Sequence, residues 1–153
     1  MSLYLVQHGI NLPKEKDPDK SLSEQGEFEV KRMASLAKDQ GFPVSRIIHS
    51  GKKRAQQTAE IFDSSLSSEK GVEEQQGLGP TDDPKKFAQS LDPNENLMVV
   101  GHLPFLEKLT SYLVTGSPDT PVFKFQNSGI LCLDKDKETD SWIIKWSLMP
   151  RIE

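Results

Sequence analysis

Two apolar runs, each ending beside a histidine and a glycine, constrain the fold more than any other feature. Leu3–Gln7 precedes His8, and Leu97–Val100 precedes Gly101 and His102. Short apolar runs that are rich in branched residues and bounded by glycine are typical of buried strands. In open α/β sheets, ligands bind beyond the carboxyl ends of the strands. The sequence therefore predicts a site that brings together two imidazoles from distant parts of the chain.

The composition bounds the class of protein. The chain has 153 residues, and we expect one domain spanning residues 1–153. Its formal net charge of -4 and its pI of about 5.4 argue against a nucleic-acid partner, whose binding surface is usually basic. Cys132, the single cysteine, lies within an apolar run and is expected to be a buried thiol. With no apolar run of ~20 residues and no signal-peptide pattern, we expect no membrane partner and a cytoplasmic location.

Helical periodicity and helix-end signals predict four helices. The first has Ser23 as its N-cap and stops at Gly41. The others are expected at Lys52–Asp63, at Pro84–Leu91 and from Pro104 onward. The polar segment Ser64–Pro80 shows no periodicity, so we expect a mobile connection without a strand there.

Strand-like segments first alternate with these helices and then follow one another directly. They are Leu3–Gln7, Arg46–His49, Leu97–Val100, Val122–Phe125, Gly129–Asp134 and Ser141–Met149. Strands separated by helices predict a parallel centre, and the final hairpin predicts an antiparallel edge, along which Trp142 and Trp146 share one face. The expected fold class is α/β, a three-layer α/β/α sandwich around a mixed, mostly parallel central sheet.

A basic residue at the start of the second helix predicts an anion site. Arg54 falls in the first turn, at the same end of the sheet as His8 and His102. Free N–H groups and the helix dipole favour negative charge there, and the guanidinium fork matches phosphate oxygens. His49 also ends a strand, but we expect a structural or rim position for it, and a solvated helix start for Lys52 and Lys53.

Four motifs in order resemble the histidine phosphatase superfamily, which has the phosphoglycerate mutase-like fold. The family has Arg-His-Gly after the first strand, Leu-Ser/Thr-x-x-Gly, Ser-x-x-x-Arg-Ala-x-x-Thr-Ala, and Gly-His before a helix. Here these stand at Gln7–Gly9, Leu22–Gly26, Ser50–Ala59 and Gly101–His102. The resemblance covers nearly the whole chain and is greatest to the small SixA-type phosphohistidine phosphatases.

This resemblance implies a mechanism and a set of site residues. His8 is the nucleophile that becomes a phosphohistidine, and Arg54 and His102 stabilise the charge on the phosphoryl oxygens. The implied phosphate-binding residues are Gln7, Gly9, Asn11, Ser50, Arg54 and His102. No metal and no cofactor are implied. The implied partner is a phosphorylated protein, such as a histidine-containing phosphotransfer domain, and inorganic phosphate or sulfate is expected to bind in the pocket.

A general acid is the least defined part of this mechanism. Family members that cleave phosphoesters carry a carboxylic acid before the third predicted strand, and Asp82 and Asp83 are the candidates here. Their simplest interpretation is a turn and an N-cap ahead of Pro84. Only one short helix fits between Ser64 and Glu95, so we expect an open, shallow pocket and a macromolecular substrate rather than a small metabolite.

One position departs from the family pattern. Gln7 stands where the family has an arginine that holds the phosphoryl oxygens. A glutamine donates a neutral hydrogen bond and brings no charge, a difference of roughly 1–2 kcal/mol. Gln7 therefore favours an alternative function, a weakened or inactive relative that binds phosphorylated partners. A three-histidine zinc site and a mutase are poorer alternatives, because the chain shows neither a fourth ligand nor the long insertion of larger members.

Overall fold

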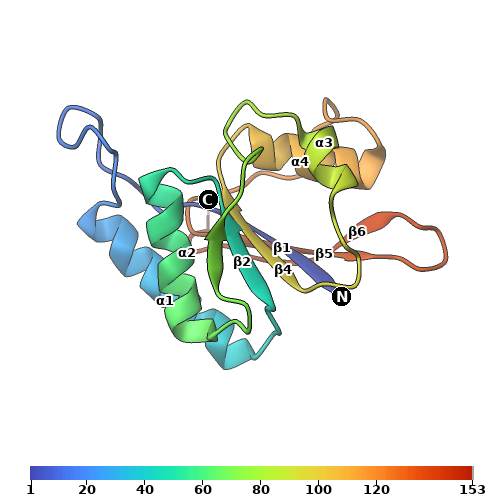
Figure 1. Cartoon of the computed structure of the whole chain (residues 1–153), viewed down its shortest axis with the longest axis horizontal. Helices are drawn as coiled ribbons and strands as arrows, with labels where there is room; N and C mark the ends of the chain where they lie inside the picture. The colour runs from blue at the N-terminus through green and yellow to red at the C-terminus, as the bar shows by residue number, and fades with distance from the viewer. Residues whose placement is uncertain (153) are drawn as a thin grey trace.

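The computed structural model describes residues 1–152, in which six strands form one sheet and four helices cover it (Figure 1). The strands are β1 (Ser2–Gln7), β2 (Arg46–His49), β3 (Val72–Glu74), β4 (Leu97–Gly101), β5 (Ile130–Lys135) and β6 (Trp142–Leu148). The helices are α1 (Glu24–Gln40), α2 (Lys53–Leu66), α3 (Pro84–Gln89) and α4 (Phe105–Thr115). The predicted α/β sandwich with a mixed sheet is confirmed.

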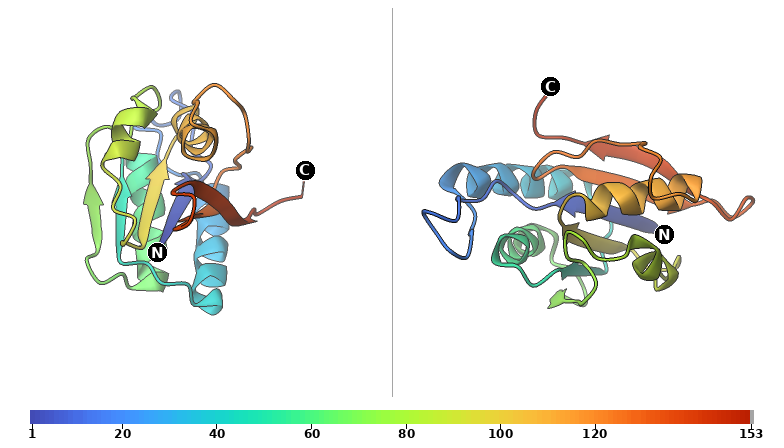
Figure 2. Two further views of the ribbon diagram at one scale, coloured as in Figure 1. Left: turned by 90° about the vertical axis from the view of Figure 1, so that its right-hand side faces the viewer. Right: turned by 90° about the horizontal axis from the view of Figure 1, so that it is seen from above.

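The strand order β3-β2-β4-β1-β5-β6 places β1 and β4 side by side at the centre of the sheet. The first four strands in this order are parallel, and β5 and β6 form the antiparallel edge that the sequence predicts. Helices α1 and α2 lie on one side of the sheet and α3 and α4 on the other (Figures 1 and 2). The chain therefore leaves β1 and β4 toward opposite faces, which opens a crevice at their carboxyl ends.

Alternation along β1 divides the core into two layers. Tyr4 and Val6 pack with the apolar face of α1 and α2, whereas Leu3 and Leu5 pack with α3 and α4. All four side chains are buried, so β1 has no solvent-facing side. This burial on both faces explains why its sequence is a continuous apolar run. Cys132 is a buried thiol on β5, as predicted.

Local chemistry fixes the start of α1 against the loop that follows β1. Ser23 is the N-cap, and its side chain accepts a hydrogen bond of 3.0 Å from the N–H of Gly26. A Cβ atom at Gly26 would lie 1.9 Å from the carbonyl oxygen of Ile10. The glycine of this motif therefore permits a close approach of helix and loop, two residues after His8.

Two predictions about the connections are wrong. The segment Ser64–Pro80 contains β3, which pairs with β2 at the sheet edge. Only three residues form it and only Val72 is apolar, so it shows no periodicity. Conversely, Val122–Phe125 is not a strand, because β5 already occupies the antiparallel side of β1. Phe125 is buried instead, and its N–H donates to Glu107 of α4 at 3.3 Å.

The tryptophan stripe predicted on β6 is also corrected. A register shift pairs Cys132 with Trp146 and Leu133 with Ile144, so that one residue of β6 is extra. Beyond this bulge, the side chains of β6 that would have faced one side of the sheet face the other side. Trp146 therefore packs on the α1–α2 side of the sheet and Trp142 on the α3–α4 side.

Candidate active site

His8 follows β1 and is held as one neutral tautomer. Its Nδ1 lies 2.7 Å from the carbonyl oxygen of Gly9, which can only accept a hydrogen bond. Its Nε2 accepts a long hydrogen bond, 3.4 Å, from Nε of Arg54, which can only donate. Nδ1 therefore carries the proton, and Nε2 directs its lone pair toward Arg54. An imidazole nitrogen in this state is suited to nucleophilic attack.

The first turns of α2 fix Arg54 relative to His8. Thr58 Oγ1 accepts a hydrogen bond of 3.0 Å from the N–H of Gly9 and donates one of 2.8 Å to the carbonyl oxygen of Arg54. Thr58 is fully buried, so this bridge is protected from water. Arg54 lies in the first turn of α2, as predicted. The helix dipole and the guanidinium together favour an anion at such a position.

His102 follows β4 and lies beside His8 across the crevice. The two ring centroids are 5.0 Å apart, and His102 is buried. Its Nε2 lies 2.6 Å from Oγ of Ser50, while its Nδ1 has no hydrogen-bond partner within residues 1–152. A buried polar atom without a partner costs about 1–3 kcal/mol. The side chain therefore keeps a hydrogen-bonding capacity that no group within residues 1–152 uses.

Burial keeps both imidazoles neutral at pH 7. Desolvation is the main cause that lowers the pKa of His8 to about 4, and the positive charges of Arg54 and Lys20 lower it further. Desolvation likewise lowers the pKa of His102 to about 3, with contributions from His8, Arg54 and Lys52. The neutral form is the one that a nucleophilic histidine requires.

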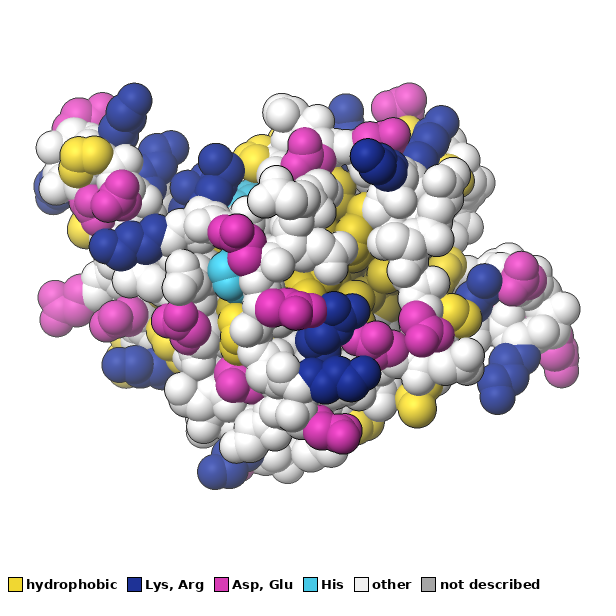
Figure 3. All heavy atoms as spheres, in the orientation of Figure 1, with side chains coloured by type: hydrophobic (Ala, Val, Ile, Leu, Met, Phe, Trp, Pro, Cys, Tyr) yellow, Lys and Arg dark blue, Asp and Glu magenta, His cyan; other side chains and the backbone are white. Residues whose placement is uncertain are grey.

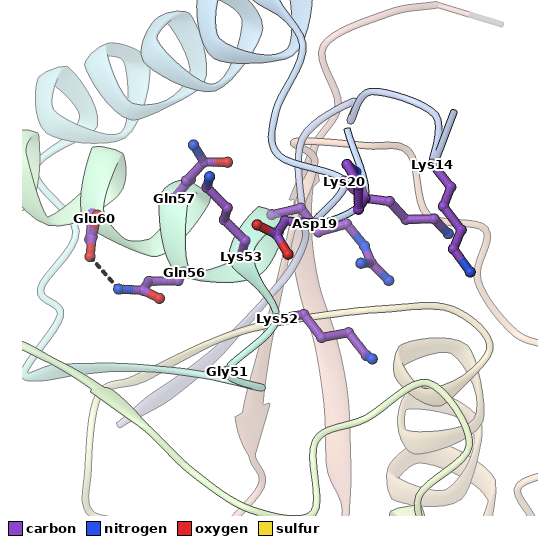
Figure 4. A pocket seen from close by; sticks show the side chains of 11 residues that line it. Lys14, Asp19, Lys20, Gly51, Lys52, Lys53, Gln56, Gln57 and Glu60 are labelled. Carbon is purple, nitrogen blue, oxygen red and sulfur yellow. Dashed lines mark hydrogen bonds between the residues drawn. The ribbon is translucent and has the colours of Figure 1, made fainter. Parts of the chain in front are cut away.

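An open cavity of about 850 Å³ adjoins this centre and shares Arg54 with it (Figure 4). Its walls are the start of α2 and the loop between β1 and α1. In the space-filling view two small patches of histidine are visible, the upper one beside Lys or Arg side chains and the lower one beside acidic side chains (Figure 3). Two carboxylates, Asp19 and Glu60, also line the cavity. Its cationic side chains are Lys14, Lys20, Lys52, Lys53 and Arg54.

Of the other predicted phosphate-binding residues, Ser50 reaches the centre, and Gln7 directly precedes His8 in the chain. Ser50 contacts His102 as described, and Gln7 is the last residue of β1, opposite Gly101 in register. The Oε1 atom of Gln7 is buried and has no partner among the described residues. Asn11 donates to the carbonyl oxygen of Leu12 within its own loop at 2.9 Å. The N–H of Gly9 is taken by Thr58, so Gly9 acts here by positioning His8.

The two predicted general-acid candidates are engaged elsewhere. Asp82 Oδ2 accepts from the N–H of Gly79 at 2.7 Å, and Asp83 Oδ1 accepts from the N–H of Lys85 at 2.9 Å as the N-cap of α3. Both line a separate hollow of about 480 Å³, and neither lines the cavity beside Arg54. These contacts are those of the turn and cap that the sequence also predicted.

His49 has the structural position expected for it. It is buried, and its Nδ1 accepts a hydrogen bond of 3.0 Å from the N–H of Gly51. This bond shapes the turn between β2 and α2. Lys52 and Lys53 are exposed, as predicted for a solvated helix start, although both also line the cavity.

Two positioning residues were missed by the sequence reasoning. Asn127 donates from Nδ2 to the carbonyl oxygen of His8 at 2.9 Å, and no local pattern marks a contact between residues 119 positions apart. Thr58 was given no role of its own. Its signal was present, because it is the threonine of the Ser50–Ala59 motif.

The fold and this centre define a class of protein: α/β proteins with two neutral histidines and an arginine at the switch point of the sheet. A model of the histidine phosphatase superfamily (branch 1) matches residues 3–79. An uncharacterised protein of Picosynechococcus is 32% identical over 126 residues, which cover 76% of this chain and 74% of that protein. The chain therefore belongs to the histidine phosphatase superfamily.

Solved structures confirm the phosphoglycerate mutase-like fold. The protein histidine phosphatase SixA, complexed with tungstate, superposes with a TM-score of 0.83 at 27% identity over 98% of this chain and 97% of that one. A mycobacterial glucosyl-3-phosphoglycerate phosphatase gives 0.67 at 14% identity, covering 95% and 97%. The phosphoglycerate mutase of Plasmodium falciparum gives 0.66 at 19% identity, covering 95% and 88%. Proteins of this fold thus differ in substrate, so the substrate of this chain has to be inferred from its site residues and not from the fold alone.

No helix within residues 1–152 is long and apolar enough to cross a membrane.

Proposed function

We propose that this chain is a phosphatase that removes the phosphoryl group from phosphohistidine on a protein. The observation that carries the proposal is the state of His8: its proton is on Nδ1, its Nε2 lone pair faces Arg54, and the ring of His102 lies 5.0 Å away. The likeness to SixA across nearly the whole chain supports the choice of phosphohistidine. That protein was solved with tungstate, a tetrahedral oxyanion like phosphate.

The reaction proceeds in two transfers. Nε2 of His8 attacks phosphorus and forms the new N–P bond while the P–N bond of the substrate breaks; the substrate ring, protonated on its other nitrogen, leaves as neutral imidazole. Water then attacks the phosphorus on His8, which releases inorganic phosphate and restores the neutral ring. We assign to Arg54 and His102 the binding of the phosphoryl oxygens, where charge accumulates during transfer.

The positions of Asp82 and Asp83 favour phosphohistidine over a phosphoester. An alkoxide needs a proton as it leaves, and both candidate acids are engaged in the turn and cap at α3. An imidazole leaves more easily and depends less on such an acid. The open cavity beside Arg54 also fits a protein surface better than a small metabolite.

A second candidate function is recognition of phosphorylated partners without turnover. Gln7 favours it, because the amide that replaces the family arginine brings no charge to the phosphate. His8, Arg54 and His102 nevertheless retain a geometry suited to catalysis, so we place the enzyme first.

The test is to trap the intermediate. After rapid quench with a phosphohistidine protein, we expect acid-labile phosphate on His8, and none in a His8→Asn variant. A His49→Asn variant is the matched control, since His49 is a buried histidine outside the centre. Phosphate trapped on His102, or phosphate release that survives His8→Asn, would overturn the assignment. Binding of the phosphoprotein without release would favour the second candidate.

A further inference from the structure

The cavity beside Arg54 carries a charge pattern that the transfer of one phosphoryl group does not require. We infer that it is a specificity site for the carboxylate side chains of a protein segment that flanks the phosphorylated residue, with Lys20 and Lys52 as its principal contacts. This inference rests on the proposed function and names the kind of protein surface that the phosphatase selects.

The charge of the cavity is opposite to that of the molecule. The chain has a formal net charge of -4, yet five cationic side chains and only two carboxylates line this cavity. At about 850 Å³ the open cavity has room for several side chains beside a phosphoryl group. A concentrated basic surface on an acidic protein selects and steers acidic partners.

The loop after β1 is built to hold Lys20 at the cavity. Asp17 Oδ2 accepts hydrogen bonds from the N–H and the hydroxyl of Ser21, and its Oδ1 accepts from the N–H of Asp19 at 3.0 Å. The carbonyl oxygen of Asp17 accepts from the N–H of Lys20 at 2.9 Å. Within this turn Lys20 has φ of 50°, a left-handed conformation that a lysine rarely adopts. Such conformations persist where the surroundings enforce them, often at functional sites.

The lysine side chains that line the cavity point in different directions. Figure 4 shows the side chains of Lys14, Lys20 and Lys52 extending to the same side of the cavity, whereas Lys53 turns back toward Gln57. The charges of Lys20 and Lys52 also contribute to lowering the pKa of His8 and of His102, respectively. A segment bound between Lys20 and Lys52 would therefore lie next to the transferred group. Lys53 provides a control of equal charge in the same cavity.

The experiment compares two phosphohistidine peptides that differ only in their flanks, one with Asp and Glu and one with Asn and Gln. We expect wild-type kcat/KM to favour the acidic peptide by about tenfold at low ionic strength, and less at high salt. The double variant Lys20→Gln/Lys52→Gln should lose most of this preference. The variant Lys53→Gln, and Lys31→Gln on the exposed face of α1, should retain it.

A binding measurement separates this inference from the proposed function. Fluorescence anisotropy with the unphosphorylated acidic peptide needs no turnover, and the double variant should bind it several-fold more weakly than wild type. Equal kcat/KM for both peptides, or a preference that survives the double variant, would overturn the inference while the phosphatase stands. A doubly phosphorylated small molecule that displaces the peptide, and is turned over faster than it, would overturn the assignment to a protein segment. Absence of any phosphate release, with intact peptide binding, would count against the proposed function alone.

Discussion

At the scale of single residues, backbone groups determine the state of the nucleophile. The carbonyl oxygen of Gly9 holds the proton on Nδ1 of His8, while Asn127 fixes the carbonyl oxygen of His8 itself. Because Gly9 follows His8 directly and Asn127 comes from the segment before β5, local and distant contacts together orient the ring before substrate binds. Such preorganisation lowers the barrier, since no reorganisation is needed at the moment of reaction.

The substitution Gln7→Arg should raise activity. It restores a charged donor beside His8, where a charge-assisted hydrogen bond is worth roughly 1–2 kcal/mol more than a neutral one, a factor of roughly 5–30 in kcat/KM. The measurement is kcat/KM on one phosphohistidine protein at low and high salt, and the gain should be larger at low salt. Gln7→Met, with similar length and no charge, should show no gain. If Gln7→Arg is no faster while its thermal melt is intact, the pocket is built around glutamine and the binding function moves ahead.

The substitution Thr58→Val should weaken both the fold and catalysis. It keeps the shape of the buried side chain but leaves the N–H of Gly9 without its acceptor, which costs about 1–3 kcal/mol. Urea unfolding and kcat measure the two effects. Thr58→Ser retains the hydroxyl and should recover most of kcat. If Thr58→Val and Thr58→Ser lower kcat equally, the bridge between Gly9 and Arg54 is not what positions the nucleophile.

At the scale of elements, the sequence predicts what local patterns encode. The predicted strands that end before His8, at His49 and before His102 are confirmed, because short apolar runs are visible without knowledge of the fold. The Ser23 cap and the Gly41 stop were correct for the same reason, since each is a local signal at a helix end.

Features that depend on distant partners could not be predicted. The edge strand β3 is only three residues long and is defined by its pairing with β2. Glu29 is buried within α1, where a charge is unexpected, because Arg151 pairs with it at 2.6 Å from 122 positions away. Asn127 at the active site belongs to the same category. The spacing of residue types along the chain does not reveal contacts between residues so far apart in sequence.

The helix α1 offers a test of why its first turn contains glycine. In an exposed helix position, Gly→Ala stabilises by about 1 kcal/mol. At Gly26 the added Cβ would lie 1.9 Å from the carbonyl oxygen of Ile10, and such overpacking typically costs 1–3 kcal/mol. We therefore expect Gly26→Ala to lower the free energy of unfolding, and to lower kcat because Ile10 lies two residues from His8.

Chemical denaturation of Gly26→Ala beside Ser35→Ala makes this comparison within one helix. Ser35 is exposed in α1, and alanine there should stabilise by a few tenths of a kcal/mol. Stabilisation by both substitutions would show that the approach of Ile10 to α1 relaxes at little cost.

At the scale of the whole molecule, topology assembles the site. Because β1 and β4 are adjacent and parallel, their carboxyl ends bring His8 and His102 together from opposite parts of the chain. Helix α2 then adds Arg54 from the neighbouring strand β2. The same crevice excludes water from the imidazoles, so the arrangement that creates the site also makes folding sensitive to their protonation.

The stability of the molecule should therefore rise with pH across the range in which the histidines titrate. In the unfolded chain both histidines have a pKa of about 6.5, whereas folding lowers the pKa of His8 to about 4 and of His102 to about 3. Between these values the unfolded state binds more protons, so acid favours unfolding.

At pH 5 each of the two histidines should lower the free energy of unfolding by about 2 kcal/mol relative to pH 7.5. Urea unfolding at these two pH values, at constant ionic strength, measures the difference. The double variant His8→Asn/His102→Asn should lose most of the dependence, leaving the smaller contribution of His49, whose pKa burial also lowers. If wild type is equally stable at pH 5 and pH 7.5, both imidazoles titrate normally, and His8 would be protonated in mild acid rather than held as a nucleophile.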